Sequence, residues 1–160
     1  MMKIKIIAVG KIKQQALNVL IGEYEKRIRP YAQLEIIEVS DVAIPRDASE
    51  LEQYSVLEQE GNKILKLIQP QDYIVALAIE GQSYDSLTFS SELMNMLVLG
   101  QATITFVIGG SLGLSSTIKN RAQKLISFSA MTFPHQLMRL FLLEQIYRAW
   151  RIIKNEPYHK

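Results

Sequence analysis

Cysteine is absent from this chain of 160 residues, and so are long apolar runs. Without thiols the protein can form no disulfide, use no thiolate nucleophile and bind no zinc through cysteine, which suits a reducing compartment. No stretch approaches the ~20 apolar residues of a membrane-spanning helix. Residues Met1–Lys5 lead directly into a strand pattern rather than into a signal peptide. We therefore expect a cytoplasmic protein that does not enter a membrane.

Several catalytic motifs are also missing. The pair Gly10-Lys11 lacks the remaining glycine and hydroxyl residue of a phosphate-binding loop, and no G-x-G-x-x-G follows the first apolar run. Both histidines, His135 and His159, are separated by a predicted helix, which argues against a multi-histidine metal centre. Ser111 and Ser129 follow predicted strands without the G-x-S-x-G pattern of a hydrolase. We expect no metal site, and neither ATP hydrolysis nor dinucleotide chemistry is supported.

The composition of the chain suits one compact folded domain. Hydrophobic side chains make up 48% of the sequence, enough for a substantial core. Because no internal repeat, low-complexity tract or Gly/Ser linker divides the chain, we expect residues 1–160 to form a single domain.

Charge is distributed unevenly along the chain. The net charge is only +2, but residues 101–160 carry eight Lys and Arg against two Asp and Glu, whereas residues 1–100 carry ten against fourteen. Such a basic carboxyl-terminal part indicates an anionic partner, of which nucleic acid is the commonest large one. A solvated basic helix face is the alternative.

Hydrophobic periodicity predicts alternating strands and helices. The predicted strands are Lys3–Val9, Leu34–Val39, Tyr73–Ile79, Thr103–Ile108 and Lys124–Phe128. The predicted helices are Gln14–Arg29, Leu51–Ile68, Ser86–Leu99, Leu114–Arg121 and Pro134–Lys154, with a mobile loop at Asp41–Ser49. This alternation predicts an α/β fold with a mainly parallel sheet covered by helices on both faces.

Two turns follow predicted strands late in the chain. Gly109–Gly113 comes directly after one strand, and the segment Phe128–His135, which contains the hydroxyl residues Ser129 and Thr132, comes at the end of another. Ligands of open α/β sheets bind outside the carboxyl ends of the strands, where glycine lets the backbone approach them closely. We place a cofactor at these turns, a tight structural turn being the alternative. His135 has packing or capping as its default role, with Thr132 as a candidate helix N-cap.

The last helix and the tail add two further expectations. Apolar residues such as Leu142, Ile146 and Trp150 lie on more than one side of the helix, which predicts packing against both the sheet and a second subunit. The tail Tyr158-His159-Lys160 joins a ring that can stack on a base to groups that can meet a phosphate or accept a proton. A frayed terminus without function is the alternative.

Several segments together resemble one family, the small bacterial ribosomal RNA large-subunit methyltransferases of type H. The matching segments, which extend over essentially the whole chain, are Ile6–Lys11, Glu23–Arg27, Gly109–Gly113, Phe128–Gln136, Glu144–Ala149 and Pro157–Lys160. This family belongs to the SPOUT methyltransferases.

The resemblance implies a fold and a chemistry that composition cannot show. It implies a SPOUT-type α/β fold with a carboxyl-terminal trefoil knot, a homodimer, bound S-adenosyl-L-methionine, and N3-methylation of a pseudouridine in 23S rRNA of the assembled ribosome. The cofactor-binding positions carried over from it are Leu77, Gly109, Phe128, Ser129, Ala130, Met131, Thr132 and Phe133.

The same resemblance suggests the catalytic and RNA-binding residues. We expect Tyr158 and His159 to be catalytic, positioning the base and assisting removal of its proton, without deciding which one accepts the proton. Candidate phosphate contacts are Arg139, Arg148, Arg151, Lys154 and Lys160. Two alternatives stay open: a ribosome-binding protein without catalytic activity, and a methyltransferase of the same fold acting on tRNA or another rRNA site.

Overall fold

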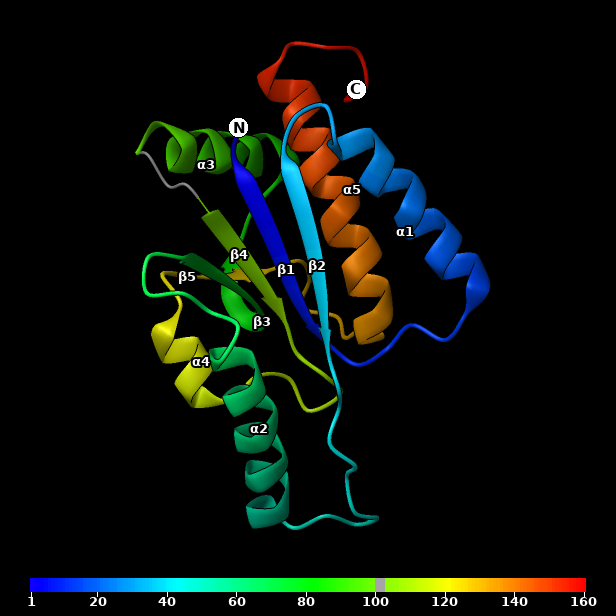
Figure 1. Cartoon of the computed structure of the whole chain (residues 1–160), viewed down its shortest axis with the longest axis vertical. Helices are drawn as coiled ribbons and strands as arrows, with labels where there is room; N and C mark the ends of the chain where they lie inside the picture. The colour runs from blue at the N-terminus through cyan, green and yellow to red at the C-terminus, as the bar shows by residue number, and fades with distance from the viewer. Residues whose placement is uncertain (100–102) are drawn as a thin grey trace.

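A five-stranded sheet organises the computed structural model, which describes residues 1–99 and 103–160 (Figure 1). The strand order is β2-β1-β4-β3-β5, and every pair of neighbouring strands is parallel. The strands are β1 (Lys3–Val9), β2 (Gln33–Val39), β3 (Tyr73–Ser83), β4 (Thr103–Ile108) and β5 (Lys124–Ser127). The helices are α1 (Gln15–Ile28), α2 (Glu50–Leu65), α3 (Ser86–Val98), α4 (Ser116–Arg121) and α5 (His135–Ile153). The predicted α/β fold with a parallel sheet is confirmed.

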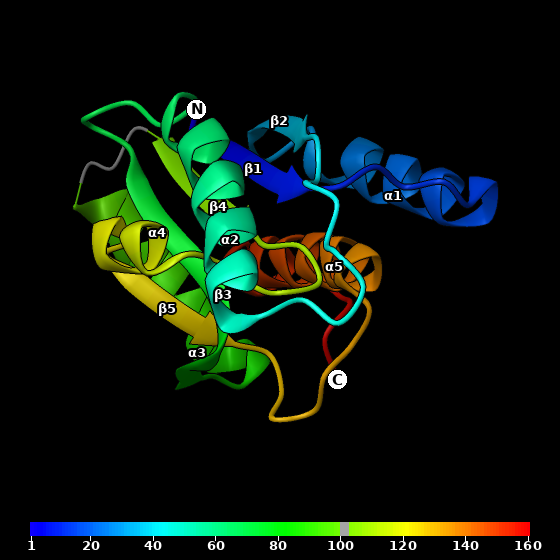
Figure 2. The same cartoon turned by 90° about the horizontal axis from the view of Figure 1, so that it is seen from below.

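Helices cover both faces of the sheet. Helices α1, α3 and α5 pack on one face and α2 and α4 on the other (Figure 2). Side chains of a strand alternate between faces: Ile4 and Ile6 of β1 enter the core beneath α1 and α5, whereas Ile7 and Val9 enter the core beneath α2 and α4. The continuous apolar run of β1 is therefore explained by burial on both sides, as in other parallel sheets.

Strand β3 is longer than predicted, ending at Ser83 rather than Ile79. Its register against β5 shifts between Leu77 and Gln82, both of which pair with Ile126. A Cβ at Gly81 would lie 2.6 Å from the carbonyl carbon of Leu125, so this close backbone approach requires glycine. The sequence prediction ended this strand at Ile79, because a strand that continues through a bulge leaves no clean alternation.

Helix α5 begins differently from the prediction. Pro134 occupies the cap position without a side-chain hydrogen bond, so the expectation that Thr132 caps the helix was wrong. The carbonyl of Pro134 accepts hydrogen bonds from the backbone N–H groups of Leu137 and Met138, which places the first helical turn after the proline. Because His135 is then the first helical residue, its ring packs next to Gly10 at the end of β1.

A buried ion pair ties the sheet together on the side of α2. Lys5 of β1 donates to Asp72 at 2.8 Å, and their side chains are 7% and 3% exposed. Asp72 also accepts hydrogen bonds from the hydroxyl of Thr105 and the backbone N–H of Gln69. Every group of this cluster has partners, which is the condition for tolerating charge in a core.

The topology brings the two predicted ligand turns to one edge of the sheet. Strands β3, β4 and β5 are parallel neighbours, so their carboxyl ends lie together, and α5 starts from the same edge. Helix α5 then runs back along the sheet, and both chain termini lie toward the amino ends of the strands, away from these turns (Figure 1). The trefoil knot and the single-domain organisation stay predictions.

Candidate active site

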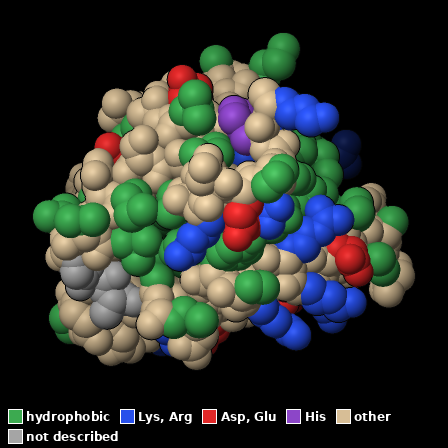
Figure 3. Space-filling model, turned by 90° about the horizontal axis from the view of Figure 1, so that it is seen from above, with side chains coloured by type: hydrophobic (Ala, Val, Ile, Leu, Met, Phe, Trp, Pro, Cys, Tyr) green, Lys and Arg blue, Asp and Glu red, His purple; other side chains and the backbone are tan. Residues whose placement is uncertain are grey.

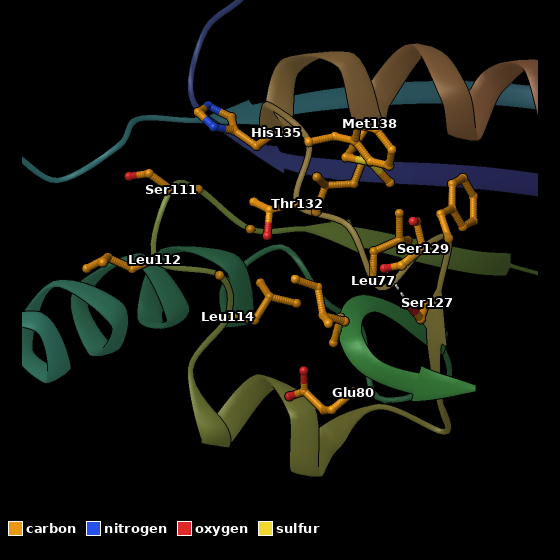
Figure 4. Close-up of a pocket in the computed structure, with 18 of the residues that line it drawn as sticks. Leu77, Glu80, Ser111, Leu112, Leu114, Ser127, Ser129, Thr132, His135 and Met138 are labelled. Carbon is orange, nitrogen blue, oxygen red and sulfur yellow. Dashed lines mark hydrogen bonds between the residues drawn. The ribbon is translucent and has the colours of Figure 1, made fainter. Parts of the chain in front are cut away.

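A cavity of about 670 Å³ lies at the carboxyl ends of β3, β4 and β5 (Figure 4). Its walls are the end of β3, the turn after β4, the segment between β5 and α5, and the first turn of α5. The cavity falls within the ~300–1,000 Å³ typical of sites for small molecules and cofactors. It lies where open α/β sheets bind their ligands.

The glycine turn after β4 is shaped by steric necessity. A Cβ at Gly109 would lie 2.3 Å from the carbonyl oxygen of Gly113, far inside contact distance. Gly113 has φ +85°, in the left-handed region that favours glycine, and its N–H donates to the carbonyl of Gly110 at 3.0 Å. The predicted tight turn is confirmed, and because it also lines the cavity, its role in holding a ligand stays a prediction that this geometry allows.

Hydrogen bonds order the opposite wall. The hydroxyl of Ser127 donates to the carbonyl of Ser129 at 3.1 Å, and the hydroxyl of Ser129 accepts from the N–H of Met131 at 3.0 Å (Figure 4). The structure brings the predicted cofactor residues together around the cavity, with one exception. Leu77, Gly109, Phe128, Ser129, Met131, Thr132 and Phe133 line it, whereas Ala130 is exposed and does not.

Several lining residues escaped the sequence reasoning. Glu80 and Lys119 line the cavity and form a salt bridge of 2.5 Å, and the hydrogen bond from Lys119 holds the pKa of Glu80 below its ordinary value. Met138 of α5 also lines the cavity, next to His135, which ends the second turn predicted to hold the cofactor. Lys119 lies on a short helix whose side facing the cavity no pattern reveals.

The carboxyl-terminal tail folds onto α5 rather than into this cavity. The hydroxyl of Tyr158 donates to Oε1 of Glu144 at 3.0 Å, and Arg148 donates to both oxygens of the same carboxylate. Nη1 of Arg148 lies 3.1 Å from Nδ1 of His159. The structure therefore brings the two predicted catalytic residues together, and neither lines the cavity of the same chain.

The tail side chains are held in defined chemical states. Burial raises the pKa of Tyr158 well above its ordinary value, and the hydrogen bond to the Glu144 carboxylate raises it further. The phenol is therefore protonated at neutral pH. Because a guanidinium can only donate, Nδ1 of His159 accepts from Arg148, and a neutral imidazole then carries its proton on Nε2.

The five predicted phosphate contacts fall into three groups by exposure. Arg139 is 4% exposed and is enclosed by Glu38 at 2.7 Å and the carbonyl of Gly10 at 3.1 Å. Arg148 and Arg151 are partly buried in ion pairs with Glu144 and Glu156, whereas Lys154 and Lys160 are exposed. A phosphate contact by Arg139 requires it to leave its present partners.

A second cavity of about 730 Å³ lies on the other side of the segment after β5. Ser127, Phe128, Ser129 and Phe133 line both cavities, and the second one also reaches Glu144 of α5, the acceptor of the Tyr158 hydroxyl. One short segment therefore separates the predicted cofactor site from the carboxylate that holds the tail.

In the part of the chain that the structure describes, no group of three or more His, Asp or Glu side chains is arranged to hold a metal ion. Within residues 1–99 and 103–160, no helix is long and apolar enough to cross a membrane.

Comparison with known proteins adds sequence relatives and structural neighbours. A family model described as "Predicted SPOUT methyltransferase" matches residues 2–159. Proteins named "Ribosomal RNA large subunit methyltransferase H" from Streptococcus uberis and Streptococcus pneumoniae are 53% and 52% identical over 159 residues, covering 99% of this chain and 100% of each relative.

The structural neighbours are more distant in sequence. A probable methylase family protein from Haemophilus influenzae has a TM-score of 0.56 at 11% identity, over 99% of this chain and 71% of the other. A probable methyltransferase from Bordetella pertussis has a TM-score of 0.56 at 12% identity, over 92% and 96%. At these identities the two structures show a shared fold.

Proposed function

Because this chain belongs to the SPOUT methyltransferase family and is an enzyme that transfers methyl groups, we propose that it uses S-adenosyl-L-methionine to methylate N3 of a pseudouridine in 23S rRNA of the assembled ribosome. The observation that carries the proposal is the cavity at the carboxyl ends of β3, β4 and β5, lined by nearly every residue predicted to hold the cofactor. The names of the full-length relatives support ribosomal RNA as substrate.

The cavity fits the proposed methyl donor. Leu77, Leu112 and Phe133 supply apolar surface for an adenine ring, and the ordered backbone of Ser129–Thr132 supplies donors and acceptors for its edge. At Gly109 the backbone itself forms the wall, because a side chain there would collide with Gly113. When bound, S-adenosyl-L-methionine supplies an electrophilic methyl group on a positively charged sulfur.

The task of the protein is then mainly positioning and proton removal. Reaction at N3 requires the nitrogen to be aligned with the methyl group and to lose its proton at some stage. The raised pKa of Tyr158 keeps its phenol protonated, so in this proposal it acts as a hydrogen-bond donor that orients the base. His159 is then the candidate proton acceptor, and to serve as one its Nδ1 leaves Arg148.

A homodimer reconciles the position of the tail with that of the cavity. Since the tail does not line the cavity of its own chain, we propose that it completes the cavity of the partner. Next to the cavity, Met131 is 71% exposed, and Phe133 and Phe141 are each 38% exposed and pack edge to face at 5.7 Å. This apolar surface is suited to contact with a second copy.

The RNA surface in this proposal is formed by basic side chains of the carboxyl-terminal part. Several Lys and Arg side chains gather on the face of the molecule near the termini, with a few acidic ones between them (Figure 3). Lys154 and Lys160 are the accessible predicted contacts. Arg148 and Arg151 can contribute while remaining paired, because each guanidinium has more donors than its carboxylate partner uses.

The comparisons bear differently on the two alternatives that the sequence left open. Membership of a methyltransferase family argues against a purely ribosome-binding role. A target in tRNA or at another rRNA site stays possible within the same fold, and the names of the relatives favour the large ribosomal subunit.

The decisive experiment is methyl transfer from labelled S-adenosyl-L-methionine to ribosomes from a strain lacking this protein, with the modified nucleoside identified by mass spectrometry. We expect N3-methylpseudouridine in 23S rRNA. A Gly109→Ala variant, which distorts the cavity wall, serves as the inactive control. Donor binding without transfer to ribosomes, together with transfer to tRNA, would overturn the proposed substrate and retain the donor.

A further inference from the structure

The segment Glu23–Arg27 of α1 has no part in the proposed function, yet its side chains reach the tail region. Helix α1 packs on α5, and Tyr24 and Arg27 lie one turn apart on the side that faces it. Both side chains contact Tyr147 of α5: the ring of Tyr24 lies 6.2 Å from it, edge to face, and the guanidinium carbon of Arg27 lies 5.8 Å from its centroid.

Tyr147 is in turn the ring against which the tail packs. The rings of Tyr147 and Tyr158 lie 4.8 Å apart with planes inclined by 68°, the closest aromatic pair in the described part of the chain. Tyr147 thus lies between α1 and the tail. A change in its position is transmitted to Tyr158, whose hydroxyl must also keep its bond to Glu144.

Tyr147 also contacts residues other than Tyr24 and Arg27. Tyr31 lies 6.4 Å away, and the guanidinium carbon of Arg151 lies 5.9 Å from the ring centroid. Tyr31 is itself stacked on Trp150 at 5.9 Å. With these contacts in place, the side of Tyr147 that faces α1 depends on Tyr24 and Arg27. Arg27 also lies 5.1 Å from the ring of Tyr24, so one cation bridges the two rings.

We infer that α1 holds the carboxyl-terminal tail in position, with Tyr24 and Arg27 as positioning residues that act on Tyr158 through Tyr147. The catalytic consequence of this inference rests on the proposed function, because the order of the tail affects the reaction only if Tyr158 and His159 take part in it. The contacts that hold the tail through Tyr147, called the clamp below, are measurable without any substrate.

The contacts are individually weak, so the effect of each substitution is graded. Exposed cation–π contacts and aromatic pairs change a local equilibrium by about two- to fivefold each. Loss of Arg27 therefore loosens the tail without unfolding the domain. Such a substitution is then expected to lower kcat and leave donor affinity unchanged, because none of these residues lines the cavity predicted to bind the methyl donor.

The experiment compares Arg27→Ala and Tyr24→Phe with the control Lys26→Ala. Lys26 precedes Arg27 on the same helix, is 69% exposed and forms a salt bridge with Glu23 of that helix. Tail order is measured on the full-length protein as the rate at which carboxypeptidase removes residues 158–160, followed by mass spectrometry. Methyl transfer and donor affinity are measured in parallel, and Arg27→Lys tests rescue by a cation without the planar guanidinium.

We expect Arg27→Ala to speed trimming of the tail by about two- to fivefold, with unchanged donor affinity and a lower kcat, and Arg27→Lys to lie in between. Tyr24→Phe keeps the ring and loses the hydroxyl, so it has a smaller effect on trimming. Trimming at the rate of Lys26→Ala would overturn the inference. Faster trimming with unaltered methyl transfer would support the clamp and contradict the catalytic role proposed for the tail.

Discussion

The hydroxyl of Tyr158 donates to the carboxylate of Glu144 at 3.0 Å, and the same carboxylate receives Arg148. The Glu144 carboxylate therefore holds Tyr158, which precedes His159 in the sequence, and Arg148, which contacts the His159 ring. The tail is thus an ordered part of the structure, although a terminus of this length is normally frayed.

Replacement of Tyr158 by phenylalanine tests the role of that hydroxyl. A hydrogen bond to a charged group contributes enough that we expect kcat to fall about 10- to 100-fold, with donor affinity unchanged because Tyr158 lies outside the cavity. The pH profile is the second readout. Since the pKa of Tyr158 is raised, the wild-type enzyme should show no gain in rate attributable to a phenolate between pH 7 and 9. A tyrosine-dependent rise there would show that Tyr158 is the base.

Replacement of Gly109 by alanine tests the cavity wall. The added Cβ would lie 2.3 Å from the oxygen of Gly113, so the turn must move and donor binding should weaken by at least about tenfold, the equivalent of one lost hydrogen bond to the ligand. Isothermal titration with S-adenosyl-L-methionine measures this change.

The matched control for this variant is Gly22→Ala. Gly22 lies within α1, and a Cβ there meets nothing within 4 Å. The control should bind the donor normally and gain about 0.5–1 kcal/mol of stability from helix propensity. Equal donor affinity in both variants would show that the glycine turn does not form the binding site.

The cavity also shows what the sequence could and could not predict. The turn at Gly109–Gly113 was placed there because open α/β sheets bind ligands at the carboxyl ends of their strands, a rule that needs only the order of elements, whereas Leu77 and Phe133 were carried over from the family resemblance. Whether the Lys119 side chain faces the cavity depends on how α4 packs on the sheet, and the local sequence pattern does not encode that packing. Likewise the extra length of β3 depends on a register shift against β5, a tertiary contact that overrides the turn-like composition of Glu80–Ser83.

Arg139 also shows this limit of sequence analysis, because it was predicted to be a phosphate contact and is buried in the structure. Its position among basic residues indicated a surface cation, but the fold buries it against Glu38 and the end of β1. Charge counts report how many cations a segment has. Which of them face solvent is decided by the packing of α5 against α1 and the sheet.

The buried pair Lys5–Asp72 provides a prediction of stability. Replacing Asp72 by asparagine leaves Lys5 charged in the core, and breaking such a pair costs about 3–5 kcal/mol. Urea unfolding at pH 7 should show this loss, while activity per folded molecule stays near normal because the pair lies away from the cavity. An unchanged urea midpoint would contradict the assignment of this pair as a structural support.

Acid titration gives the sign of the same effect. Burial by itself raises the pKa of Asp72, but hydrogen bonds from Lys5, Gln69 and Thr105 outweigh it and leave the pKa below the ordinary value of 3.8. A lowered carboxyl pKa contributes stability above the unfolded value that is lost as the pH falls through the folded one. Wild-type stability should therefore decline below about pH 4 more steeply than that of Asp72→Asn.

Salt dependence tests the proposed RNA surface. Lys154 and Lys160 are exposed, so their joint replacement by alanine should weaken ribosome binding and lower the slope of log affinity against log salt by about 0.7–0.9 for each lost phosphate contact. Lys66, an exposed lysine just after α2, is the matched control. If both variants keep the wild-type slope, the two lysines are solvated surface residues without RNA contacts.

Heterodimers of defined composition test whether the tail serves the partner's cavity. One chain carries Gly109→Ala and the other carries Tyr158→Phe with His159→Ala, and different tags allow purification of the mixed species. If each tail completes the opposite cavity, the intact tail reaches the intact cavity once per dimer, and about half of wild-type activity returns from two inactive parents.

The reciprocal arrangement distinguishes this outcome from simple recovery of folding. In this second heterodimer one chain carries all three substitutions and its partner is wild type. If the tail serves the partner's cavity, the intact cavity meets a defective tail and no competent site is left. If the tail serves the cavity of its own chain, the wild-type chain retains about half of the activity. The pair of measurements has opposite outcomes for the two arrangements. Since Tyr158 and His159 lie outside their own chain's cavity, we expect activity in the first heterodimer and none in the second.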